Sequence, residues 1–134
     1  MNEPFIVDSS IWIDVAAQRE GPETERLQYA LLEDPTFVVI GDLIIYEVVR
    51  GFRGAKNRRE LRKDLALLPQ VDMVSSARVQ IAAERYAVLR ENGITIRRAI
   101  DTLIASYCID EDIPLLFTDR DFLPFVTHFG LRVA

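Results

Sequence analysis

The stretch Phe5-Ile-Val-Asp-Ser-Ser10 decides the fold, because three apolar residues are followed at once by a carboxylate and two hydroxyls. A short unbroken apolar run is typical of a strand that is buried on both faces of a parallel sheet. The change from apolar to polar residues at Asp8 predicts that the strand leaves the core there. Ligands of open parallel sheets bind beyond the carboxyl ends of the strands, so we expect Asp8 to lie at a binding edge.

Outward from this stretch, short apolar runs alternate with segments of helical periodicity. The runs predict further strands at 37–40, 71–74, 115–117 and, at an edge, 131–133. The periodic segments and their end signals predict helices at 10–18, 23–33, 43–52, 56–68, 75–93, within 95–108 and at 122–129. Asp8, Ser9 or Ser10 is expected to cap the first helix, and Asp42 the third. The alternation predicts an α/β fold with a small parallel sheet between helices and right-handed crossovers.

Length and composition predict one domain, spanning residues 1–134. Of the 134 residues, 49% are apolar, which is enough for a single core. No apolar run is long enough to cross a bilayer, and no basic segment precedes a long apolar stretch at the N-terminus, so we expect a cytoplasmic protein. The single Cys108 can form neither an internal disulfide nor a multi-cysteine metal site.

The formal charge of -5 ordinarily disfavours a nucleic-acid partner, because neutralisation of phosphates drives such binding. The basic residues are nevertheless concentrated in one stretch, at Arg50, Arg53, Lys56, Arg58, Arg59, Arg62 and Lys63. Such a run is most often a solvated helix face. The sharper alternative is a local surface that follows a phosphate backbone.

Glu47 stands in the middle of the apolar helix expected at 43–52. An unpaired carboxylate is costly to bury, so this side chain needs a partner. One interpretation is a weak salt bridge to Arg50, one turn later. The other is that Glu47 points into a pocket at the sheet edge.

Asp101 lies near the start of the helix expected within 95–108. The helix dipole alone favours a carboxylate there, but the apolar neighbours Ile100 and Leu103 indicate a recessed side chain.

Farther on, the run 115–117 is followed by Thr118-Asp-Arg-Asp-Phe122, which repeats the pattern of the opening strand. Asp-Arg-Asp is also ordinary turn chemistry. If the two strands are neighbours in the sheet, Asp119 or Asp121 comes close to Asp8.

A cluster of Asp8, Glu47, Asp101 and Asp119 has a definite chemical consequence. Carboxylates held close together raise one another's pKa, so some are protonated or a divalent cation is bound. Oxygen ligands without a histidine or cysteine set favour hard cations, Mg²⁺ or Mn²⁺. Such a site activates water and shields the charge of a phosphodiester, as in metal-dependent nucleases.

The four acidic segments resemble the signatures of PIN-domain ribonucleases. They are Asp8 after the first strand, Glu47 in Glu-Val-Val-Arg-Gly51, Asp101 in Ile-Asp-Thr-Leu-Ile-Ala105, and Thr-Asp-Arg-Asp-Phe122. Their order and the length of the chain resemble the VapC toxins of toxin-antitoxin pairs. The resemblance implies a Mg²⁺-dependent endoribonuclease, usually a homodimer, that is silenced by a VapB-type antitoxin whose C-terminal segment enters the acidic groove.

The resemblance also implies roles for individual residues. Asp8 and Asp101 are expected as the principal metal ligands, with Glu47 and Asp119 completing the site. Asp119 is favoured for the fourth place because it is nearer the strand exit, and Asp121 is then expected to hold the loop. Hydrogen bonds from Ser9 or Ser10 and from Thr118 are expected to support the carboxylates or a bound water.

The mechanism expected is in-line attack of a metal-activated water on an RNA phosphodiester, with Arg50 or Arg97 contacting phosphate. Two other functions are compatible with parts of this sequence. An aspartate-nucleophile phosphatase normally needs a second acid two residues after the first, where this chain has Ser10. A catalytically silent PIN-like binding module is the second rival, although such modules tend to lose acids and this chain retains all four.

Overall fold

Strand β1 (Phe5–Val7) is an interior strand of a four-stranded parallel sheet in the computed structural model, which describes residues 3–134. The other strands are β2 (Val38–Gly41), β3 (Gln70–Val71) and β4 (Leu115–Leu116), and the order in the sheet is β3-β2-β1-β4. β1 therefore pairs with β2 on one side and with β4 on the other, with Val7 opposite Leu116. This interior position explains the apolar run, because every residue of β1 is buried.

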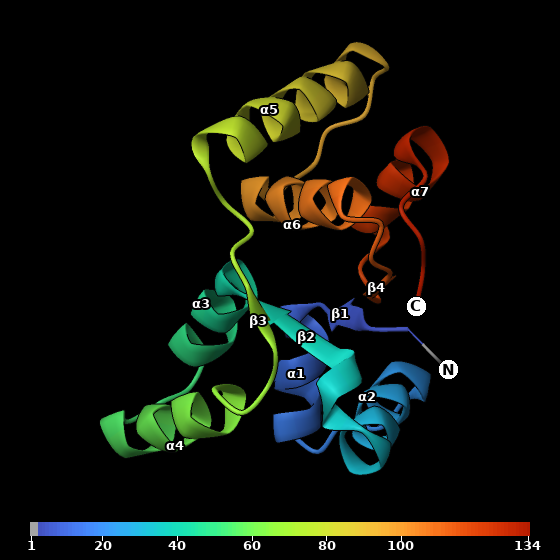
Figure 1. Ribbon diagram of the computed structural model, residues 1–134. Coiled ribbons are helices and arrows are strands. Elements are labelled where there is room, and N and C mark those ends of the chain that lie inside the picture. The colour runs from blue at the N-terminus through green and yellow to red at the C-terminus, as the bar shows by residue number, and fades with distance from the viewer. Residues whose placement is uncertain (1–2) are drawn as a thin grey trace.

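Helices follow the strands and cover the sheet on both sides (Figure 1). They are α1 (Ser9–Ala16), α2 (Pro22–Glu33), α3 (Asp42–Arg50), α4 (Ala55–Leu65), α5 (Ser76–Glu91), α6 (Ala99–Asp110) and α7 (Leu123–Phe129). Helices α5 and α6 lie on one side of the strands, and α1, α2 and α4 lie on the other. The predicted α/β fold, with a small parallel sheet between helices, is confirmed.

The core lies between the sheet and these helices. Its largest fully buried side chains come from strands of the sheet and from helices on both sides of it, and they include Phe5, Ile11, Ile104, Phe122 and Phe125. Aromatic and aliphatic side chains of this size each contribute about 1.5–3 kcal/mol when buried, so this layer fixes the strand ends from which the polar residues emerge. Among residues 3–134, none of the helices combines the length and apolar character that a bilayer span requires.

Several predicted boundaries are wrong at their ends, and the causes are local. Phe37 belongs to a short 3₁₀ turn, η1 (Pro35–Phe37), because the Asp34 side chain accepts a hydrogen bond from the Thr36 amide. Helix α4 ends at Leu65 instead of residue 68, since the residue before Pro69 is disfavoured in helical conformation. The predicted first helix, 10–18, begins at Ser9 and ends at Ala16.

The predicted strand 71–74 is reduced to β3 because the Met73 amide donates to the Asp42 side chain at 2.9 Å instead of continuing a strand. Asp42 thus opens α3 without being its N-cap, a position that Gly41 holds. A Cβ on Gly41 would lie 2.3 Å from Sδ of Met73, so a side chain at this position would force the buried Met73 side chain to move.

Elements near the C-terminus are also shorter than predicted. The expected strand 131–133 is a single parallel bridge between Leu115 and Val133, and β4 ends at Leu116 instead of residue 117. The expected helix 122–129 divides into a 3₁₀ turn, η2 (Arg120–Phe122), followed by α7. α6 begins at Ala99, after an irregular segment, and extends to Asp110.

Candidate metal centre

Three carboxylates that are distant in sequence meet at the carboxyl end of β1. Asp8 directly follows β1, Glu47 lies in the middle of α3, and Asp101 lies in the first turn of α6. Each offers a carboxylate oxygen, and these oxygens lie within 4.8 Å of one another. The three residues are only 3%, 4% and 1% exposed, respectively. The predicted gathering of Asp8, Glu47 and Asp101 is therefore present.

Two serines of α1 hold two of these carboxylates. The Ser9 hydroxyl donates to Oε1 of Glu47 at 2.9 Å, and the Ser10 hydroxyl donates to Oδ2 of Asp8 at 2.7 Å. Asp8 occupies the N-cap position of α1, but its side chain makes no capping hydrogen bond to the helix. The Ser10 hydroxyl therefore holds Oδ2 of this carboxylate at the cluster.

Arg98 is a site residue that the sequence pattern does not single out. Its Nη2 atom donates to Oε2 of Glu47 at 2.5 Å and to Oδ1 of Asp101 at 3.1 Å. The available signal was its i,i+3 spacing from Asp101, which places both on one side of α6. Arg50, the partner considered for Glu47, approaches the same Oε2 only to 3.9 Å and lies over the ring of Tyr46.

The cluster holds more negative charge than Arg98 neutralises. Burial raises the pKa of Asp101 to about 7; Arg98 opposes this shift, whereas the charges of Asp8, Glu47 and Asp119 add to it. Burial also raises the pKa of Asp8, against the hydrogen bond from Ser10 and with the charge of Glu47. Desolvation and mutual repulsion thus both disfavour the fully ionised cluster, and an added cation would relieve both.

The donor set fits a hard divalent cation. Oδ1 of Asp8 is buried and has no hydrogen-bond partner in the described part of the chain, although a buried carboxylate oxygen normally has one. Oxygens of Asp8, Glu47 and Asp101 are all close enough to share one ion. Carboxylate oxygens are the ligands preferred by Mg²⁺ and Mn²⁺, so these three residues are suited to hold such an ion.

Comparison with known families and structures identifies the fold. The family model described as PIN domain matches residues 5–124. The chain belongs to the PIN-domain family. The predicted resemblance to PIN domains is thereby confirmed, and the carboxylates of this PIN domain lie on elements within the matched range.

Solved structures give the same fold. A chain of the Rickettsia felis VapBC2 complex with a promoter DNA fragment superposes with a TM-score of 0.72 at 18% identity, covering 97% of this chain and 96% of that chain. A chain of DNA-bound VapBC from Salmonella typhimurium gives 0.70 at 14% identity, covering 98% and 97%. A toxin-antitoxin complex from Klebsiella pneumoniae gives 0.64 at 19% identity, covering 95% and 94%.

The two aspartates after β4 lie outside the three-carboxylate group of the PIN domain. Asp119 and Asp121 are partly exposed, and both are paired with Arg97, at 3.5 and 3.0 Å. Asp119 is the one whose charge contributes to the raised pKa of Asp101. Asp121 accepts hydrogen bonds from the backbone and side chain of Arg97 and so ties this loop to the segment before α6.

Thr118 and Arg50, two other predicted site residues, are exposed to solvent, unlike the three buried carboxylates. Thr118 is exposed, and in the part of the chain that the structure describes no hydrogen bond joins it to the four acids. Its expected role in supporting a carboxylate or a metal-bound water stays a prediction. Arg50 is 58% exposed at the end of α3, beside Glu47.

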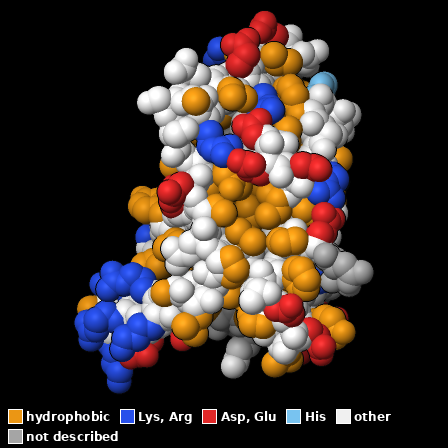
Figure 2. Space-filling model, viewed as in Figure 1, with side chains coloured by type: hydrophobic (Ala, Val, Ile, Leu, Met, Phe, Trp, Pro, Cys, Tyr) orange, Lys and Arg blue, Asp and Glu red, His pale blue; other side chains and the backbone are white. Residues whose placement is uncertain are grey.

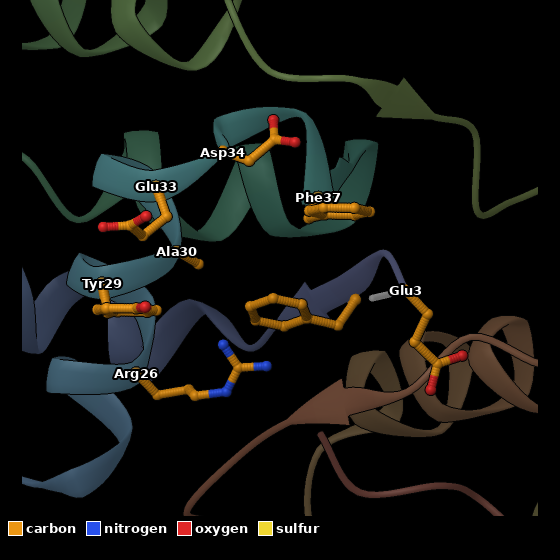
Figure 3. A pocket seen from close by; sticks show the side chains of 8 residues that line it. Glu3, Arg26, Tyr29, Ala30, Glu33, Asp34 and Phe37 are labelled. Carbon is orange, nitrogen blue, oxygen red and sulfur yellow. The ribbon is translucent and has the colours of Figure 1, made fainter. Parts of the chain in front are cut away.

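Two further surface features of the PIN domain lie away from the acids. Lys and Arg side chains gather over α4 (Figure 2), where the exposed residues are Arg53, Lys56, Arg59, Arg62 and Lys63. A separate pocket, lined by α2 and the start of β1, has the Arg26 guanidinium 4.4 Å above the Phe5 ring (Figure 3). Phe5 opens β1 whereas Asp8 follows its end, so this pocket is at the opposite end of the strand from the acids.

Proposed function

We propose that this PIN domain is a divalent-metal-dependent endoribonuclease, the VapC-type toxin of a type II toxin-antitoxin module. The observation that carries the proposal is the group of three buried carboxylates around an unpartnered oxygen of Asp8. Perturbed carboxylates gathered at a sheet edge are typical of functional sites.

Mg²⁺ is the proposed cofactor, with Mn²⁺ as a substitute. Asp8 and Asp101 are proposed as its principal ligands, with Glu47 and Asp119 completing or tuning the site. When bound, the cation supplies Lewis acidity that activates water and offsets the charge of a phosphodiester. Asp119 is preferred to Asp121 as the fourth acid because its charge acts on Asp101 and because Arg97 lies farther from it, at 3.5 Å compared with 3.0 Å for Asp121.

The chain's own residues prepare the site for in-line attack of water on the RNA phosphodiester. The Ser9 and Ser10 hydroxyls each hold one oxygen, of Glu47 and of Asp8 respectively, and Oδ1 of Asp8 is left without a hydrogen-bond partner among the described residues. Arg50 is exposed next to Glu47 and is the preferred phosphate contact. Arg97 is a weaker candidate for that contact, because it is already paired with Asp119 and Asp121.

The exposed basic residues of α4 support RNA as the substrate. No salt bridge in residues 3–134 joins Arg53, Lys56, Arg59, Arg62 or Lys63 to an acid, so their charges are available to a partner. In a chain of net charge -5, this surface is the local exception at which phosphates are attracted.

The proposed partners follow from the similar structures and from the surface. Chains of this fold occur in toxin-antitoxin complexes, which supports a VapB-type antitoxin as the inhibitor. We propose a homodimer, as the resemblance to VapC toxins implies. The RNA substrate places the activity in the cytoplasm. Light scattering on the purified chain, alone and with the antitoxin, tests both assemblies.

Incubation of the purified chain with RNA and Mg²⁺ tests the activity. We expect cleavage that EDTA and Asp101→Asn abolish and that Asp72→Asn, a matched change of an exposed acid, leaves intact. Cleavage that persists with EDTA or in Asp101→Asn rejects the metal site. RNA binding without cleavage favours the silent binding module, and turnover of a small phosphomonoester favours the phosphatase.

A further inference from the structure

We infer that Arg98 is an internal counter-ion, which occupies the acidic cluster in the metal-free protein and is displaced when a divalent cation binds. This role rests on the proposed metal site but goes beyond it. It assigns the metal-free protein its own stabilising contact, and it makes Arg98 a competitor of the metal and not a ligand or a phosphate contact.

The contacts of Arg98 are those of a cation inside the cluster. A single nitrogen, Nη2, donates to Glu47 and to Asp101, two of the three residues whose oxygens can share an ion. One positive charge therefore bridges helices α3 and α6 at the site where a divalent ion would do the same. Its proximity to Asp101 opposes the effect of burial on the pKa of that residue.

The single positive charge of Arg98 does not balance the negative charges of the cluster. One guanidinium charge faces three buried carboxylates, and Oδ1 of Asp8 has no hydrogen-bond partner among the described residues. A divalent cation brings twice the charge and can accept an oxygen from all three acids. Both cations cannot occupy the same few ångströms, because their like charges repel.

The position of Arg98 permits its withdrawal. It is the N-cap residue of α6, with extended backbone, and its side chain is 49% exposed. A long side chain at such a place can move its head into water without disturbing the helix. Its neighbour Arg97 is held by Asp119 and Asp121 and makes no contact with Glu47, so the role is specific to Arg98.

Calorimetric titration of the RNA-free protein with Mg²⁺ or Mn²⁺ tests this competition. For Arg98→Gln we expect a Kd about tenfold lower than that of the wild type, because a repelling charge near the ion is removed. Arg98→Lys keeps the charge but lacks the guanidinium and should fall between the two. Arg90→Gln, an equal loss of charge at an exposed site on α5, should bind as the wild type does.

Thermal unfolding gives the second readout. Without metal, Arg98→Gln should melt at a lower temperature than the wild type, because Glu47 and Asp101 lose their shared donor. Saturating Mg²⁺ should raise the Tm of the variant by more than it raises that of the wild type. Weaker or unchanged metal binding in both Arg98 variants, with a folded protein, overturns the inference and makes Arg98 a positioning residue.

A measurement on the wild type keeps the inference testable if the variants do not fold. In ¹⁵N spectra of the arginine side chains, the Arg98 guanidinium should rotate slowly without metal and become as mobile as exposed Arg59 when Mg²⁺ is added. Unchanged, slow rotation at saturating Mg²⁺ contradicts displacement. If the wild type and Arg98→Gln both bind no divalent cation, the metal site of the proposed function fails; if both bind equally, only the competition fails.

Discussion

The hydroxyl of Ser9, in the first turn of α1, donates a 2.9 Å hydrogen bond to Oε1 of Glu47 in α3, 38 residues along the chain. Both residues are buried, so the serine is the local donor that makes an apolar helix tolerate a carboxylate at its centre. Ser9→Ala should lower the free energy of unfolding by about 1–3 kcal/mol, because it leaves a buried acceptor unsatisfied. Urea unfolding measures this loss.

Ser76→Ala, at an exposed position in the first turn of α5, is the matched control and should change the free energy of unfolding much less. If both alanine variants unfold at the same urea concentration, the hydrogen bond to Glu47 does not stabilise the fold.

Asp101 should make the metal-free protein less stable as the pH rises. Its pKa is raised from 3.8 to about 7, so between these values the folded state holds a proton that the unfolded state releases. Stability contributed by this proton is present at low pH and is lost as the pH rises to about 7. Asp101→Asn should remove that slope and raise the metal-free Tm at pH 8. Thermal unfolding in EDTA across pH 4 to 8 measures it, and parallel curves for the two proteins contradict the assignment.

Metal binding should show the opposite pH dependence. Ligand carboxylates must lose their protons before they bind a cation, and Asp101 retains its proton until the pH reaches about 7. Mg²⁺ affinity should therefore rise about tenfold per pH unit below pH 7 and level off above it. Calorimetry in buffers of different ionisation enthalpy counts the proton released on metal binding. A Mg²⁺ affinity that is independent of pH from 5 to 8 contradicts this prediction.

Arg97 should act on the loop after β4 and not on RNA. Its side chain is 73% exposed and pairs with Asp119 and Asp121, so solvent screens these pairs and they add little to the stability of the fold. Arg97→Gln should speed amide hydrogen exchange in residues 118–122 while leaving the affinity for RNA unchanged. A clear rise in KM for RNA, with unchanged exchange in the loop, shows instead that Arg97 contacts phosphate.

The basic surface of α4 should account for much of the salt dependence of RNA binding. Replacement of Arg59, Arg62 and Lys63 by glutamine should weaken binding and reduce the slope of log K against log salt by about 2, if each contacts one phosphate. The same loss of charge at Arg19, Arg90 and Arg132, exposed residues outside α4, serves as the control. Equal slopes for the two triple variants mean that α4 is only a solvated helix.

The sequence predicts the architecture well because the short apolar runs that form the strands are its dominant pattern. An apolar run such as Phe5–Val7 has no stable place except the interior of a sheet, and the polar residue that follows must lie at its edge. The same reasoning places Asp8 correctly beside Asp101 and Glu47. Strand ends are predicted less well, because contacts such as that from Met73 to Asp42 decide them across 31 residues.

The sequence pattern does not reveal Arg98, and the reason is physical. In the sequence Arg97 and Arg98 are equivalent neighbours at a helix start. Only the backbone direction at the N-cap of α6 sends one guanidinium to Glu47 and Asp101 and the other to Asp119 and Asp121. A partner contributed by α3, 51 residues away, leaves no local trace in the sequence.

The pairing of β1 with β4 has a consequence for biosynthesis. The Asp8 amide donates to the Leu116 carbonyl at 2.9 Å, so the edge that carries Asp8 is completed by a segment near the other end of the chain. A nascent polypeptide cannot make this pairing until Leu116 has left the ribosomal tunnel. We therefore expect the acidic centre to form only after the segment that contains Leu116 has emerged, because Asp8 has no partner on that side of β1 before then.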